Sequence, residues 1–94
     1  MRIIYKSSDE IRLMREASLA VAAILEKLCE AAVPGATTWD LDQLAAAEIE
    51  RLGVTSAFLG YPGGTDYDYP AVLCTSVNEV IVHGIPSKSV VLAE

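Results

Sequence analysis

Apolar residues recur every three or four positions along the first third of the chain, which is the spacing of one face of an α-helix. Ser7 and Glu10 stand at the start of this stretch with the spacing of a capping box, in which each side chain satisfies a free backbone N–H. Pro34 and Gly35 end the pattern. The sequence therefore predicts an amphipathic helix over residues 8–32. Its apolar positions are Ile11, Met14, Val21, Ile24, Leu25 and Leu28.

A second helical pattern covers residues 39–52. Thr38 is the expected N-cap, and Asp40 and Asp42 fall in the first turn, where the helix dipole favours negative charge. Gly53 suits the end of the helix. The expected buried stripe consists of Leu41, Leu44, Ala45, Ile49 and Leu52. The expected solvated face consists of Gln43, Glu48, Glu50 and Arg51.

The pattern changes after the second helix. Residues 56–70, SAFLGYPGGTDYDYP, combine glycines, prolines and three tyrosines, which predicts a long shaped loop. Residues 71–76 and 79–84 are rich in Val, Ile, Leu and Thr, which favours two strands. The predicted fold class is therefore α+β, with two helices packed on an antiparallel sheet.

A tight turn is predicted between the two strands, because Asn78 tolerates positive φ. If Asn78 and Glu79 are its central residues, Cys74 lies directly opposite His83. Their side chains would then point to the same face of the hairpin.

Composition narrows the function classes. Of the 94 residues 52% are apolar, more than a free-standing domain of this length needs, so we expect a partner surface that the chain does not itself supply. Thirteen acidic residues against seven basic ones give a net charge of −6, which opposes binding to nucleic acid or to an anionic membrane surface. Neither a signal peptide nor a spanning segment is indicated, so we expect a cytoplasmic protein with reduced cysteines.

Four stretches of the chain resemble one enzyme family. SSDEIRLMREA, PGATTWDLD, AFLGY and CTSVNEVIVHGIP occur in the order and approximate spacing of type I methionine aminopeptidases, which remove the initiator methionine from nascent proteins. The resemblance runs over essentially the whole chain. It implies the incomplete first half of a pita-bread fold. It also implies two divalent metal ions (Co, Mn, Fe or Zn) in the complete enzyme, which activate a bridging water.

The resemblance also implies a set of substrate-binding residues. The family histidine that matches His83 contacts the substrate near the scissile amide and is not a metal ligand. Tyr61, Tyr69 and Cys74 match residues around the methionine side chain, and Phe58 matches another position of that pocket. Aromatic and thiol groups suit a thioether, because it is apolar and polarizable.

The loop departs from the family pattern. Pro62 stands where the family usually has a histidine, and the loop is about five residues longer, beyond the common range of loop lengths. Tyr67 therefore competes with Tyr69 for the pocket position. Asp66 and Asp68 have ligand-like spacing, but two loop carboxylates are too few for a metal site.

The family's metal-binding aspartates come after the point where this sequence stops. We therefore expect residues 1–94 to be the N-terminal portion of a methionine aminopeptidase-like domain, with the metal-binding C-terminal portion absent. Such a chain would bind no metal by itself, would contain no catalytic residue and would be inactive alone. In the complete enzyme the partner would be the N-terminal Met of nascent polypeptides.

Several alternatives use the same residues. A nucleophilic pair of Cys74 and His83 would lack oxyanion donors and a third orienting group. A zinc site that adds Cys29 fails on ligand count and spacing, and Cys29 is more simply a packing residue. His83 by itself would be a half-buried strand histidine. The alternative function is a non-catalytic, pita-bread-like protein-binding module that uses its sheet edge and tyrosine loop.

Overall fold

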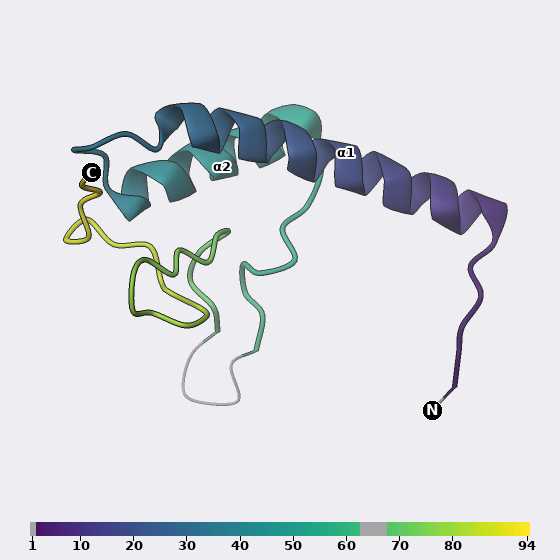
Figure 1. Ribbon diagram of the computed structural model, residues 1–94. Coiled ribbons are helices and arrows are strands. Elements are labelled where there is room, and N and C mark those ends of the chain that lie inside the picture. The colour runs from purple at the N-terminus through teal and green to yellow at the C-terminus, as the bar shows by residue number, and fades with distance from the viewer. Residues whose placement is uncertain (1, 63–67) are drawn as a thin grey trace.

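The computed structural model describes residues 2–62 and 68–94 (Figure 1). Helix α1 spans Ser8–Ala31 and helix α2 spans Thr38–Leu52. The C-terminal part of α1 runs alongside α2, whereas its N-terminal part extends beyond α2 (Figure 1). The chain after α2 winds below the two helices, and its end returns to the connection between them (Figure 1).

The predicted start of α1 is confirmed. The Ser7 hydroxyl accepts a hydrogen bond from the Glu10 backbone N–H at 3.2 Å, and the Glu10 carboxylate accepts one from the Ser7 backbone N–H at 2.9 Å. Both free N–H groups are thereby satisfied, as a capping box requires. The helix ends at Ala31, one residue before the predicted end.

The predicted N-cap of α2 is wrong by one residue. Thr37 is the cap, and it forms a capping box with Asp40 in which both hydrogen bonds are 3.0 Å long. Thr38 lies inside the helix and is 1% exposed, because its hydroxyl bonds both the N–H and the carbonyl of Ser87. Either Thr37 or Thr38 could supply the capping hydroxyl, and the contact of Thr38 with Ser87 decides between them. Gly53 ends α2 in the left-handed conformation, as expected.

The buried apolar core is small and joins three segments. Leu28 of α1, Ala45 of α2 and Val72 of the following segment form one cluster. Leu28 is the only buried residue of α1, so the apolar face predicted for this helix is covered only near its C-terminal end. Partly buried residues around the cluster are Ile24, Leu41, Leu44, Ala46, Ile49 and Leu73.

The predicted antiparallel sheet is not formed in the described ranges, which contain no strand and two isolated bridges. The predicted turn does form: Asn78 has φ 54°, and the Val80 N–H bonds the Val77 carbonyl at 3.2 Å. The flanking segments are joined by the backbone bond from the Thr75 N–H to the Gly84 carbonyl at 2.7 Å. A two-stranded hairpin is marginal without a third strand, which explains why propensity alone gave no ladder.

The predicted register of the hairpin is also wrong. Thr75 is bonded to Gly84, so Cys74 is not paired directly with His83. His83 has φ 56°, a left-handed conformation that is incompatible with a regular strand. The side chain of His83 is exposed rather than half-buried.

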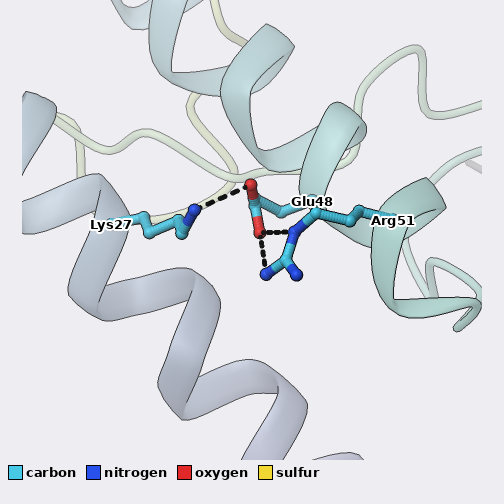
Figure 2. A network of polar contacts seen from close by, with 3 residues as sticks. All are labelled: Lys27, Glu48 and Arg51. Atoms are coloured by element: carbon cyan, nitrogen blue, oxygen red, sulfur yellow. Dashed lines mark hydrogen bonds and ion pairs between the residues drawn. The ribbon is translucent and has the colours of Figure 1, made fainter.

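The predicted solvated face of α2 is wrong at Glu48, which is 8% exposed. Figure 2 shows its carboxylate bound to Lys27 of α1 and to Arg51 of α2. The two distances are 3.2 Å and 2.7 Å. Periodicity could not show that α1 would pass over this edge of α2. The packing role predicted for Cys29 is wrong as well, because its side chain is exposed.

In the part of the chain that the structure describes, neither helix is long and apolar enough to cross a membrane.

Candidate functional site

The two ends of the tyrosine-rich loop lie side by side. The Gly60 N–H bonds the Tyr69 carbonyl at 2.8 Å, and the Tyr69 N–H bonds the Tyr61 carbonyl at 2.9 Å. The Ser56 hydroxyl accepts bonds from the N–H groups of Phe58 and the following residue at 3.2 and 3.1 Å. These local bonds fix residues 56–61 beside Tyr69 without help from a sheet.

Tyr69 is the centre of the candidate site. The Phe58 ring packs edge-to-face against the Tyr69 ring, with a centroid distance of 6.4 Å and an angle of 72°. The Tyr69 hydroxyl donates to the Leu73 carbonyl at 2.7 Å and lies 3.3 Å from the Gly84 carbonyl. The side chain therefore links the loop to both arms of the hairpin.

The pKa of Tyr69 is raised above its ordinary value of 10.0. Burial is the largest cause, and the neighbouring Cys74 thiol is the next. Tyr69 therefore stays a neutral hydrogen-bond donor at physiological pH. Phe58 packs against the Tyr69 ring, and the half-buried Cys74 thiol is a neighbour of the Tyr69 phenol, so an aromatic ring and a thiol both adjoin Tyr69 as an aromatic–thiol cluster.

The position of His83 depends on the residue that follows it. A Cβ at Gly84 would overlap the Thr75 carbonyl oxygen, so only glycine fits this close approach of two backbones. The Gly84 N–H bonds the Ser76 hydroxyl at 3.1 Å, which fixes the same peptide from the other side. His83 is thus held at its backbone while its imidazole is exposed.

The structure brings together some of the predicted site residues and not others. Phe58 contacts Tyr69, and Cys74 neighbours Tyr69. Tyr61 joins them through its backbone carbonyl, and its side chain is 67% exposed. The competing Tyr67 and the carboxylate of Asp66 lie outside the described residues.

Asp42 is a residue of this site that the sequence interpretation missed. It is 5% exposed, and one carboxylate oxygen accepts hydrogen bonds from the N–H groups of Val72 and Leu73 at 2.9 and 3.0 Å. Its position in the sequence could have indicated burial, because Asp42 stands three residues before Ala45 and seven before Ile49, on the same face of the helix as the buried stripe. An acid on the apolar face of a helix indicates a buried partner.

Comparison with known proteins places these features in a family. The model of metallopeptidase family M24 matches residues 12–94. The chain belongs to this family. A methionine aminopeptidase of Aquifex aeolicus is 45% identical over all of this chain, and one of Clostridium acetobutylicum is 47% identical over 98% of it. The chain spans 37% and 35% of the length of these two relatives.

A solved methionine aminopeptidase has the same fold over the length of the chain. The crystal structure of methionine aminopeptidase from Thermotoga maritima aligns with 99% of this chain at a TM-score of 0.89 and 40% identity. The alignment covers 35% of the Thermotoga chain. The expected resemblance to an N-terminal part of a methionine aminopeptidase is thereby confirmed.

Family M24 enzymes are metallopeptidases, and the described residues do not fit a metal centre. Across residues 2–62 and 68–94, no group of three or more His, Cys, Asp or Glu side chains is placed to hold an ion. The buried carboxylates of the described part of the chain already have partners: Asp42 binds backbone amides, and Glu48 binds Lys27 and Arg51.

Proposed function

We propose that residues 1–94 are the N-terminal portion of a methionine aminopeptidase-like enzyme and form one wall of the pocket for the first side chain of the substrate. The observation that carries this proposal is the cluster of Phe58, Tyr69 and Cys74, in a chain that is 40% identical to a solved methionine aminopeptidase. The substrate is the N-terminal Met of nascent polypeptides, which the enzyme meets in the cytoplasm.

The chemistry of the cluster suits a methionine side chain. A thioether gains about 0.3–1.5 kcal/mol from contact with an aromatic ring, and a thiol is a small polarizable neighbour for its terminal methyl group. The Tyr69 hydroxyl is already bonded to the Leu73 carbonyl, so the phenol presents a satisfied polar group rather than one that competes for water. Tyr61, with its exposed ring, completes the wall when substrate binds.

His83 is proposed as a substrate contact beside the scissile amide. Its exposed imidazole stands next to Gly84, whose carbonyl lies 3.3 Å from the Tyr69 hydroxyl, so the histidine is tied by backbone to the methionine wall. A hydrogen bond from the imidazole to the developing tetrahedral species would strengthen in the transition state.

The metal ions of such an enzyme have to be held elsewhere. The described residues offer no ligand set, and the chain spans 35% of the Thermotoga enzyme. We therefore assign the metal ligands, and the hydrolytic step that depends on them, to the C-terminal portion of a complete enzyme. The 94-residue chain by itself is proposed to be inactive.

The test is a chimera that joins residues 1–94 to the part of the Thermotoga methionine aminopeptidase that the alignment does not cover. With divalent metal, we expect it to release methionine from Met-Ala-Ser, and to lose that activity when a chelator is added. Circular dichroism and metal content establish that the chimera is folded and loaded. A folded, loaded chimera that leaves the peptide intact would refute the peptidase proposal.

Variants of the chimera test the pocket separately from the chemistry. Cys74→Ser should raise the KM for Met-Ala-Ser about threefold to tenfold with a smaller change in kcat, because the contact acts on the bound side chain. Cys29→Ser is the matched control, because Cys29 is exposed on α1. Equal changes in KM for the two substitutions would refute the placement of Cys74 in the pocket.

A second candidate is a non-catalytic protein-binding module. The apolar face of α1 favours it, because Ile11, Met14 and Leu25 are each more than half exposed. This candidate predicts that a folded and metal-loaded chimera gains no peptidase activity.

A further inference from the structure

We infer that Asp42 is a positioning residue for the pocket wall, which fixes the 72–74 segment and thereby sets the place of the Tyr69 hydroxyl and the Cys74 thiol. The effect on substrate selectivity rests on the proposed function. The placement of the two side chains does not, and it is tested without any peptidase assay.

Asp42 binds the pocket segment at two successive peptides. Its Oδ1 atom accepts the Val72 N–H at 2.9 Å and the Leu73 N–H at 3.0 Å. Within residues 2–62 and 68–94 these residues form no ladder with a strand, and the Asp42 carboxylate is the acceptor for both N–H groups. Val72 belongs to the buried cluster, which anchors the segment from its apolar side.

The same segment holds Tyr69. The Leu73 N–H is bonded to Asp42, and the Leu73 carbonyl accepts the Tyr69 hydroxyl at 2.7 Å. The N–H and the carbonyl of Leu73 are therefore both hydrogen-bonded, and they connect Asp42 of α2 to the Tyr69 hydroxyl. Hydrogen bonds in such a chain polarise one another. Cys74 is the next residue along the chain, so movement of Leu73 displaces the thiol as well.

The Asp42 carboxylate is buried, with only 5% of the residue exposed, so its hydrogen-bond partners have to compensate for the loss of water. Burial of a charge without partners is costly, and two N–H donors on one oxygen offset that cost. Alanine would leave two backbone N–H groups without an acceptor. Asparagine keeps a carbonyl oxygen, so Asp42→Asn is a conservative variant that should retain the positioning.

The first test measures alkylation of Cys74 by iodoacetamide in the intact 94-residue chain, with each cysteine followed separately by mass spectrometry. The exposed Cys29 is the internal reference. Asp42→Ala should raise the Cys74 rate about tenfold relative to Cys29, because the segment opens more often once its acceptor is lost. Asp42→Asn should stay within about twofold of the parent chain.

Thr38→Val is the matched control for general loosening. It removes two side chain–backbone bonds, both to Ser87, from the same helix and at a similar depth. The Cys74 rate should be unchanged in Thr38→Val. An equal rise in Thr38→Val and Asp42→Ala, or no rise in Asp42→Ala, would overturn the inference.

The second test uses the chimera and compares Met-Ala-Ser with Leu-Ala-Ser. Asp42→Ala should lower the preference for Met by raising the KM for the Met peptide, and Asp42→Asn should restore it. Unchanged preference in a folded Asp42→Ala chimera would overturn the selectivity part. A parent chimera without activity would refute the proposed function instead, while the alkylation result would still decide whether Asp42 positions the wall.

Discussion

Truncation of Leu28 tests how α1 is attached to the rest of the chain. Leu28 is 9% exposed and is the only buried residue of α1, where it packs against Ala45 and Val72. Leu→Ala substitutions in cores cost about 2–5 kcal/mol, and the low end applies where neighbours are partly exposed and can close the space. We therefore expect Leu28→Ala to lower the free energy of unfolding by about 2–3 kcal/mol.

This loss is large relative to the stability available. Small domains have roughly 0.05–0.15 kcal/mol per residue, and a core this small places the chain near the bottom of that range. For a domain of this size 1 kcal/mol corresponds to about 4–8 °C in Tm, so the variant should unfold about 10–20 °C earlier. Far-UV circular dichroism during thermal and urea unfolding measures both quantities.

Leu25→Ala is the matched control, because Leu25 is on the same helix and is 54% exposed. It should change the free energy of unfolding by less than about 0.5 kcal/mol. Equal losses in the two variants would refute the packing described for α1, and would mean that the part of its apolar face that contains Leu25 is covered in solution. If the free energy of unfolding rises with protein concentration, a second copy of the chain covers this surface.

Three further predictions concern polar and turn residues. Arg51 holds the pKa of Glu48 below its ordinary value of 4.5, so the stability that Glu48 contributes is present above pH 4.5 and is lost as the pH falls through its lowered folded pKa. Glu48→Gln should weaken this acid sensitivity in urea titrations, and Glu50→Gln, at an exposed site, should leave it unchanged. Burial raises the pKa of Tyr69, so the stability that Tyr69 contributes is present below pH 10.0 and is lost as the pH rises toward its pKa in the folded state. Tyr69→Phe should remove one tyrosine ionisation, followed by ultraviolet absorbance, on the alkaline side of pH 10.0. Asn78 has φ 54°, so Asn78→Ala should cost about 1 kcal/mol in thermal unfolding, and an equal cost for Asn78→Gly would contradict a backbone origin.

Local chemistry in the sequence was sufficient for the helices and the turn. Ser7 and Glu10 interact across one helical turn, and the left-handed Gly53 and Asn78 need no distant partner. These features depend on neighbours in the chain, so their energetics are visible in a short stretch of residues. The family resemblance was equally readable, because its motifs are strings of adjacent residues.

Tertiary structure alone decided which partners the buried polar residues bind and how the hairpin is arranged. The helical pattern does not identify the partners of Asp42 and Glu48. The approach of residues 72–73 to Asp42 and of Lys27 to Glu48 supplies those partners. The sheet predicted from residues 71–84 fails for the same reason, since a ladder depends on partner strands rather than on propensity. The helical phase of Asp42 indicates that its side chain is buried, but periodicity does not identify the residues that bind it. The hydrogen bonds from Asp42 to residues 72–73 therefore became visible only in three dimensions.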